Sequence, residues 1–208
     1  DSLLALDVFA ARFANAVRKG LQSAEKLDIR EIKTISRKFC FSTRQVFTPE
    51  KIVEIKEQQK KKLYRPDAQD DSGEVRMAAV YLRGIQEIEA IYSGSESVCI
   101  EAELQVIRMG PLEFLGSPFE VMQSIKNEIH AASKSEYPML MSLTNGSLGY
   151  APDQRSLDKN FHDKTGRDGN YESTMVPLIA GRLPYGNIHR ELVCYFDELN
   201  RELNRDIR

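Results

Sequence analysis

The feature that most constrains the fold is a run of alternating residues, 97–108, followed by a tight turn and a strand–helix–strand pattern. The alternation in SVCIEAELQVIR predicts a strand with one buried face. Met109-Gly110-Pro111 predicts a turn, so residues 111–116 are expected to return as an antiparallel strand. A helix is predicted over 117–132, and then a strand over 138–144 that is buried on both faces. Because a crossover makes its two strands parallel, the sheet is expected to be mixed.

The remaining segments complete an expected α/β fold, with α+β as an open alternative. Thr48-Pro49-Glu50 has the composition of a helix start, with a hydroxyl cap and proline at the first helical position. Residues 145–185 are expected to be mostly loop. The further predictions are a strand over 31–41 and helices over 2–22, 48–63, 74–92 and 187–204. We therefore expect one domain, residues 1–208, with about four or five strands and about five helices.

Composition excludes several classes of protein. The 208 residues carry a net charge of −2, which does not favour a nucleic-acid partner, and no run of about 18 apolar residues predicts a membrane span. The three histidines lack the spacing of a zinc motif. Three scattered cysteines argue against a disulfide framework, and Cys40 and Cys99 are expected to be buried thiols. The chain opens on an amphipathic helix pattern rather than a signal peptide, which suggests a fragment, a processed chain or an expressed domain.

Polar residues follow both strands of the expected parallel pair. Ser117 and Glu120 follow the first strand, and residues Asn145 to Tyr150 follow the second. Because the carboxyl ends of parallel strands share one edge of a sheet, Glu120 and Tyr150 could meet there. Glu120 is either a capping residue that reaches back to Ser117 or a carboxylate available to a cation. Tyr150 is either a packing residue or a residue whose hydroxyl is positioned by the backbone for a function. Glu113 is expected to face solvent.

The segment after Tyr150 repeats the pattern of flexible residues before a tyrosine. In GRDGNYES, residues 166–173, glycine and asparagine precede Tyr171 and Glu172. A loop of about forty residues is unusual in a compact domain unless it has a function. The whole loop is therefore a stronger functional signal than any single residue in it.

Three ordered motifs resemble the neutral/alkaline, non-lysosomal ceramidases and their bacterial relatives. They are MGPLEFLGSPFE (109–120), TNGSLGYAPD (144–153) and DGNYES (168–173). The resemblance covers roughly residues 75–205 and is to the latter half of that family's catalytic region. It implies a zinc-dependent hydrolase involved in lipid metabolism that cleaves an N-acyl amide bond.

The resemblance also implies roles for individual residues. Glu120 and Tyr150 match the family's glutamate and tyrosine zinc ligands, and Tyr171 matches a tyrosine that polarises the scissile carbonyl. Ser117, Asn145, Gly149 and Glu172 belong to the supporting loops. The other ligands would be histidines of an N-terminal half, so the isolated chain is expected to be inactive.

The resemblance suggests a secreted or periplasmic protein with an N-acyl lipid or another amide as substrate. The alternative is a relative without catalytic activity that acts as a binding or interaction module.

Overall fold

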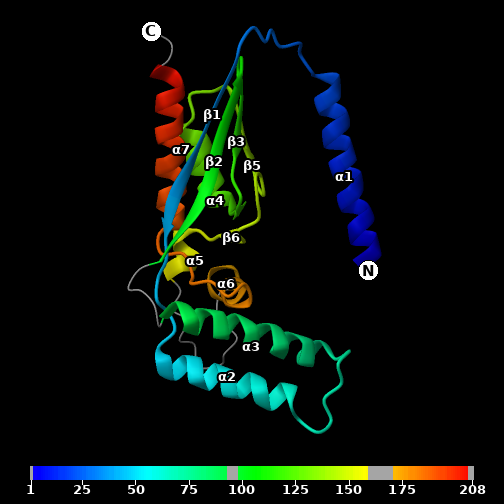
Figure 1. Cartoon of the computed structure of the whole chain (residues 1–208). Coiled ribbons are helices and arrows are strands. Elements are labelled where there is room, and N and C mark those ends of the chain that lie inside the picture. Colours follow the sequence, from blue (N-terminus) through cyan, green and yellow to red (C-terminus); the bar gives the residue numbers. More distant parts are fainter. Residues whose placement is uncertain (1, 93–97, 159–170, 206–208) are drawn as a thin grey trace.

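The computed structural model describes residues 2–92, 98–158 and 171–205 and confirms an α/β fold (Figure 1). Its strands are β1 (Ile32–Ser42), β2 (Cys99–Met109), β3 (Leu112–Gly116), β4 (Glu120–Val121), β5 (Tyr137–Met141) and β6 (Tyr150–Ala151). Its helices are α1 (Ser2–Gln22), α2 (Pro49–Leu63), α3 (Gly73–Tyr92), α4 (Gln123–Ala132), α5 (Gln154–Asp158), α6 (Val176–Ile179) and α7 (Ile188–Arg205), with a π-helical turn η1 (Tyr171–Met175) before α6.

The main sheet is mixed, as the sequence predicts. Its strand order is β1-β2-β3-β5, and β4 pairs with β6 in a second, two-stranded sheet. β2 is antiparallel to both β1 and β3, whereas β3 and β5 are parallel. The crossover through α4 therefore delivers the ends of β3 and β5 to the same edge.

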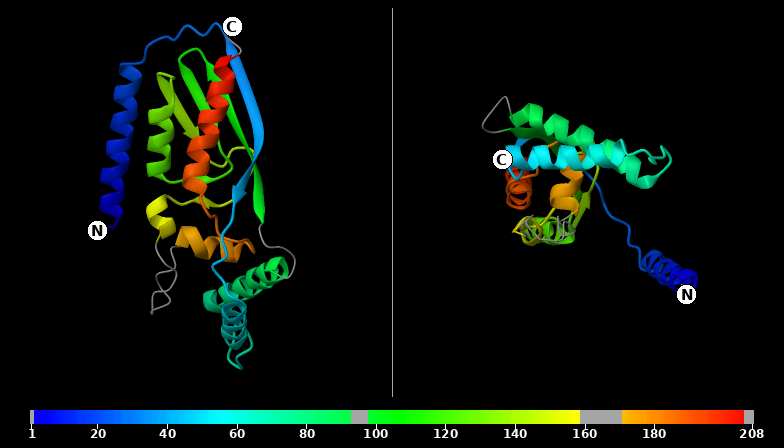
Figure 2. Two further views of the ribbon diagram at one scale, coloured as in Figure 1. Left: turned by 90° about the vertical axis from the view of Figure 1, so that its left-hand side faces the viewer. Right: turned by 90° about the horizontal axis from the view of Figure 1, so that it is seen from below.

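One face of the sheet is covered by α7 and α4 and contains the larger core. The inward side chains of the strands, such as Phe41, Leu104 and Leu115, pack against Leu192 and Phe196 of α7. Figure 2 shows α7 lying along the strands on this face. The helix predicted over 187–204 therefore buries its apolar side in this core, as expected.

A second apolar cluster joins α2, α3 and α6 below the sheet. Thr48 caps α2 as predicted, because its hydroxyl accepts the backbone N–H of Lys51 at 3.2 Å. Gly84 lets α3 approach α6 closely, since a Cβ at this position would lie 1.8 Å from the carbonyl oxygen of Leu178.

Helix α1 stands apart from the rest of the chain (Figures 1 and 2). Its periodicity predicted the helix correctly, but none of its residues is buried. The apolar side chains of α1 are therefore exposed, and Phe9 and Phe13 are 68% and 66% accessible. Within the described residues, no helix is both long and apolar enough to cross a membrane.

The helix predicted over 117–132 begins only at Gln123, so the expected helix start at Ser117 is wrong. Glu120 instead lies in β4 and is not a first-turn residue of a helix. The physical reason is the burial of Phe119, whose ring packs edge-on against Phe41 and Tyr185 at centroid distances of 4.9 and 5.4 Å. Tertiary packing has overridden the local capping signal.

Two expectations about burial are also wrong. Strand β5 is an edge strand whose Tyr137 and Met141 are exposed, because the described helices that pack on the sheet cover one of its faces. Glu113 does not face solvent. It is fully buried and accepts hydrogen bonds from Arg108, from Ser133 Oγ at 2.5 Å and from Asn200 Nδ2 at 3.5 Å.

Cys40 and Cys99 are exposed and form a disulfide bond, contrary to the expectation of buried thiols. Cys99 lies opposite Ser42 and Cys40 opposite Glu101, so the bond runs diagonally between β1 and β2. The odd number of cysteines concealed this pair because the third, Cys194, is a free exposed residue of α7. Within the described part of the segment 145–185, which was expected to be mostly loop, the short elements β6, α5, η1 and α6 are present; residues 159–170 of that segment lie outside the described residues.

Candidate functional site

The structure places Glu120 and Tyr150 side by side. They are directly paired in the parallel ladder of β4 and β6, although thirty residues separate them in the sequence. The Glu120 carboxylate is also close enough to the Tyr150 phenol for its charge to act on it. The edge shared by β3 and β5 thus presents a carboxylate and a phenol at one point.

Main-chain hydrogen bonds hold the two segments together. The N–H of Glu120 donates to the carbonyl of Gly149 at 2.9 Å, and that of Leu148 donates to Pro118 at 2.8 Å. Buried Ser117 bonds through its carbonyl to the N–H of Thr144 at 2.8 Å, while its hydroxyl accepts the N–H of Phe119. Because backbone groups fix both segments, the relative positions of Glu120 and Tyr150 do not depend on mobile side chains.

Four residues of the loop before Tyr150 have positive φ, as a tight turn requires, and Leu143 and Gly146 are two of them. Asn145 has φ of 61° and Gly149 has φ of 82°. The amide of Asn145 is directed to Gln105 of β2, at 3.5 Å from its side-chain oxygen, and not to Glu120. Asn145 and Gly149 therefore shape the backbone and are not ligands of the carboxylate–phenol pair.

Tyr171 joins this pair from a different part of the chain. Its ring meets that of Tyr150 edge-on, with centroids 6.1 Å apart, and it is 55% exposed. Glu172 follows in η1 and is close enough to Tyr150 for its charge to act on the phenol. Residues 168–170 of the DGNYES motif lie outside the described residues, whereas Tyr171 and Glu172 are placed at the site.

The electrostatic environment keeps Tyr150 protonated. The negative charge of Glu120 is the main cause that raises the pKa of the phenol, and desolvation, Tyr171 and Glu172 act in the same direction. The protonated hydroxyl can then donate to Glu120. A cation bound between the two oxygens would reverse this preference, because it would stabilise both the carboxylate and the phenolate.

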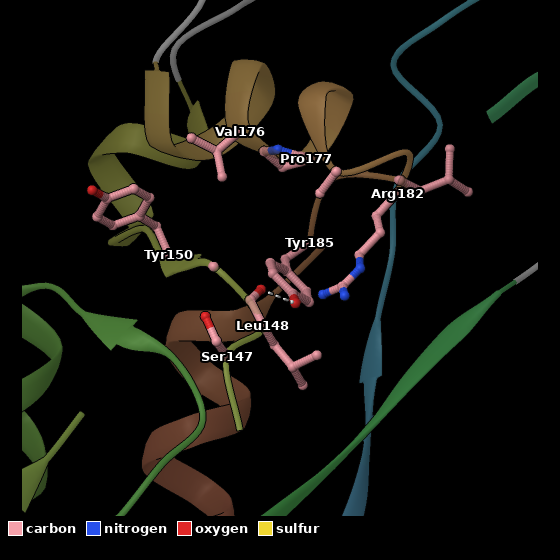
Figure 3. A pocket seen from close by; sticks show the side chains of 10 residues that line it. Ser147, Leu148, Tyr150, Val176, Pro177, Arg182 and Tyr185 are labelled. Carbon is pink, nitrogen blue, oxygen red and sulfur yellow. Dashed lines mark hydrogen bonds between the residues drawn. The ribbon is translucent and has the colours of Figure 1, made fainter. Parts of the chain in front are cut away.

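A pocket of about 230 Å³ adjoins Tyr150 (Figure 3). The Tyr150 ring lies on one side, the Tyr185 ring and Arg182 lie on the other, and Val176 and Pro177 form the wall contributed by α6. The Tyr185 hydroxyl donates to the Leu148 carbonyl at 2.9 Å and is therefore already engaged. The pocket is mostly apolar, with Arg182 as its charged group.

The sequence analysis missed several residues of this environment. Arg182 and Tyr185 lie in the segment expected to be loop, and nothing in their local spacing marks them. Tyr81 of α3 is likewise unmarked, yet it interacts electrostatically with Tyr171, which lies ninety residues later in the sequence. The pKa of Tyr81 is raised mainly by burial.

The donor set suits part of a metal site. Glu120 and Tyr150 offer two adjacent oxygen ligands, whereas protein zinc sites have three or four protein ligands. Among the described residues, no group of three or more histidine, cysteine, aspartate or glutamate side chains is arranged to hold a metal. His189 lies elsewhere, with Nε2 3.0 Å from Glu128 and Nδ1 accepting the N–H of Gln154.

Comparisons with known proteins do not assign the chain to a family. Searches of family models, curated proteins and solved structures find no significant match.

Proposed function

We propose that this chain is the C-terminal part of a ceramidase-like, zinc-dependent amidohydrolase that cleaves an N-acyl amide bond. The observation that carries the proposal is the pairing of Glu120 with Tyr150 across β4 and β6, beside an apolar pocket. The motif resemblance suggests zinc-dependent amide hydrolysis. The Glu120–Tyr150 pair and the adjoining pocket are where this reaction would take place.

Glu120 and Tyr150 would hold the metal through their side-chain oxygens. When bound, zinc polarises an acyl oxygen and lowers the pKa of a bound water molecule. The chain's own contribution is positional, because backbone hydrogen bonds fix the main-chain segments that carry both ligands before any cation arrives. Such preorganisation avoids the cost of ordering the ligands during binding.

Tyr171 would act on the substrate carbonyl. Its ring contacts Tyr150, and its exposure leaves the residue accessible to a ligand. A protonated phenol beside the carbonyl donates a hydrogen bond to the negative charge that develops on its oxygen. Removing one such donor typically lowers kcat by about 10²–10³.

The pocket beside Tyr150 would receive the acyl group of an N-acyl lipid or another amide. Its volume of about 230 Å³ is below the roughly 300–1,000 Å³ typical of sites for drug-sized ligands. It therefore suits a short acyl group, or the carbonyl-proximal part of a longer one. Val176, Pro177 and Leu183 would provide apolar contacts.

The remaining ligands would come from the N-terminal half of the same catalytic region. Two oxygen donors do not complete a zinc site, so the isolated chain should bind zinc weakly and hydrolyse nothing. The Cys40–Cys99 disulfide supports a secreted or periplasmic location, because such bonds persist in oxidising compartments.

Two experiments test this proposal. Calorimetric titration of zinc into the 208-residue chain should show weak binding, and tight stoichiometric binding with amidase turnover would contradict the proposed division of the site. In the complete polypeptide, Glu120→Gln and Tyr150→Phe should each remove most zinc binding and hydrolysis of N-acyl substrates. Tyr171→Phe should lower kcat by about 10²-fold with little change in KM.

The control is Tyr64→Phe, which alters an exposed phenol on the C-cap residue of α2. It should leave both zinc content and hydrolysis unchanged. Equal losses in the Tyr64 and Tyr171 variants would show that the effect of Tyr171 is not specific to the site.

A non-catalytic binding module is the second candidate. It is favoured by the apolar pocket with Arg182, since this feature does not require a metal. A complete polypeptide that lacks zinc and hydrolytic activity, yet binds a short acyl carboxylate in a manner sensitive to Arg182→Ala, would support this function instead.

A further inference from the structure

The pocket beside Tyr150 contains an arginine without an acidic partner. Arg182 is half-buried in the pocket wall, and among the residues that the structure describes no carboxylate forms an ion pair with it. By contrast, Arg37, Arg65 and Arg108 each pair with a glutamate. A guanidinium stays charged at physiological pH and loses part of its hydration when it is half-buried. Arg182 is therefore a candidate partner for an anion from outside the chain.

Tyr185 does not use the full hydrogen-bonding capacity of Arg182. The guanidinium lies beside the Tyr185 hydroxyl (Figure 3). Burial raises the pKa of this phenol, and Arg182 is close enough for its positive charge to act against that rise. The phenol donates its own proton to the carbonyl of Leu148 at 2.9 Å. A guanidinium presents several N–H donors in a planar fork, so donors of Arg182 remain available to a ligand.

Glu87 of α3 approaches the same turn but is committed to another partner. Gly181 follows α6 with φ of 64°, and a Cβ at this position would lie 2.8 Å from Oε2 of Glu87. Glu87 accepts a hydrogen bond from Arg83 at 3.1 Å. In the same turn, the N–H of Arg182 donates to the carbonyl of Pro177 at 2.9 Å. The main chain that carries Arg182 is therefore fixed, while its guanidinium is left without this glutamate.

The rest of the pocket lining is mostly apolar. Its apolar contacts come from Leu148, Val176, Pro177 and Leu183 and from the rings of Tyr150 and Tyr185. Ser147 adds a hydroxyl that is directed toward the pocket, whereas the Tyr150 hydroxyl points away from it (Figure 3). The lining therefore suits a ligand that has a short apolar body and a single anionic group.

The charges around the pocket set the orientation of such a ligand. Tyr150 and Arg182 lie on opposite sides of the pocket (Figure 3). Glu120 and Glu172 are close enough to Tyr150 for their negative charges to act on it. An anionic group is therefore repelled at the Tyr150 side and attracted at the Arg182 side. The anionic group of the ligand should face Arg182, and its apolar body should point toward Tyr150.

We propose that this pocket binds a small monocarboxylate with an apolar body of about six carbon atoms, held by Arg182. The planar guanidinium matches a carboxylate through parallel hydrogen bonds, and the Ser147 hydroxyl is the second donor. Val176, Pro177 and Leu183 contact the apolar body. Such binding requires neither zinc nor hydrolysis, and so it does not rest on the proposed function.

Titration of ligands into the 208-residue chain, followed by ¹H–¹⁵N NMR, tests this proposal. Hexanoate should shift the amide signals of residues 147–150 and 182–185 and reach saturation. Hexanamide has the same body without the charge and should bind at least about tenfold more weakly, because hydrogen bonds between charged groups are the stronger ones. Inorganic phosphate has the charge without the body and should also bind at least about tenfold more weakly. Equal affinity for hexanoate and either of these ligands would overturn the proposal.

Variants locate the binding at Arg182. Arg182→Gln should weaken hexanoate binding about tenfold or more, whereas Arg182→Lys keeps the charge, loses the planar fork and should lose less. Ser147→Ala removes an exposed hydroxyl, leaves Arg182 in place and should weaken binding by a smaller factor. Arg190→Gln is the matched control, because Arg190 is an exposed residue of α7 outside the pocket lining. Hexanoate binding that is unaffected by Arg182→Gln, or equally weakened by Arg190→Gln, would contradict the proposal.

The outcomes distinguish this pocket from the proposed function. Saturable binding of hexanoate that depends on Arg182 would support the pocket whether or not the protein binds zinc. Amide hydrolysis by the complete polypeptide, with no hexanoate binding to the 208-residue chain, would refute the pocket and leave the proposed function standing. Small shifts spread over the whole protein surface without saturation would show non-specific association and would likewise refute the pocket.

Discussion

Glu113 and Glu120 lie seven residues apart on one segment, yet the fold gives them opposite environments. Glu113 is fully buried on β3, where Arg108, Ser133 and Asn200 satisfy its oxygens. Glu120 is exposed on β4 and faces Tyr150, with Tyr171 and Glu172 nearby. The comparison shows that a carboxylate with a complete set of partners fixes structure, whereas one with an incomplete set is available for binding.

The largest expected difference between the two carboxylates is in their contribution to the free energy of unfolding. Glu113→Ala leaves the half-buried Arg108 guanidinium without its buried carboxylate partner and should lower the free energy of unfolding by about 3 kcal/mol. Glu120→Ala removes an exposed side chain and should change it by less than about 0.5 kcal/mol. Urea unfolding at pH 7 measures both. Similar losses in the two variants would contradict the distinction.

The next prediction concerns the disulfide bond that joins β1 and β2 of the main sheet. Cys40→Ser opens a loop with a sequence separation of 59 residues and should cost about 2–4 kcal/mol, chiefly by freeing the unfolded chain. Cys194→Ser alters the free exposed cysteine and is the matched control, with a change below about 0.5 kcal/mol. Urea unfolding of both variants without reductant is the measurement. A Cys40 variant as stable as the Cys194 variant would show that the bond does not stabilise the sheet.

Tyr185 provides a further prediction, at alkaline pH. Burial raises the pKa of Tyr185 from 10.0 to about 12, so the folded state retains this proton more tightly than the unfolded state. The resulting stability is present below pH 10 and is lost as pH rises toward 12, by about 2–3 kcal/mol. Tyr185→Phe should show a smaller decline between pH 10 and 12 in urea unfolding. An identical decline in both proteins would show that groups other than Tyr185 cause the loss of stability at alkaline pH.

Helices and strands were predicted correctly where all the local sequence features indicate the same structure. The start of α2 combined a hydroxyl cap at Thr48, proline at position 49 and the acidic Glu50, and the structure confirms α2 over Pro49–Leu63. The segment after β3 had equally clear capping residues, but burial of Phe119 and pairing with residues 143–151 produced a strand instead. Local propensity could not anticipate this result, because the competing interactions come from distant parts of the chain.

The candidate site was predictable only in part, for the same reason. The crossover rule brought Glu120 and Tyr150 to one edge, and the structure places them together, although through β4 and β6 and not at a helix start. The pocket was not predictable, because Arg182 and Tyr185 line it from a segment whose local pattern does not mark them. The metal-binding and catalytic roles remain proposals.

The most direct test of the carboxylate–phenol pair is the pKa of Tyr150 in the metal-free chain. It would be measured by NMR titration of ¹³C-labelled tyrosine in the unmodified protein and in Glu120→Gln, with Tyr64 as the internal reference. Because the Glu120 charge is the main cause of the raised pKa, the substitution should move the Tyr150 value down toward 10 and leave Tyr64 unchanged. A Tyr150 titration that is the same in both proteins would show that the two groups do not form a site.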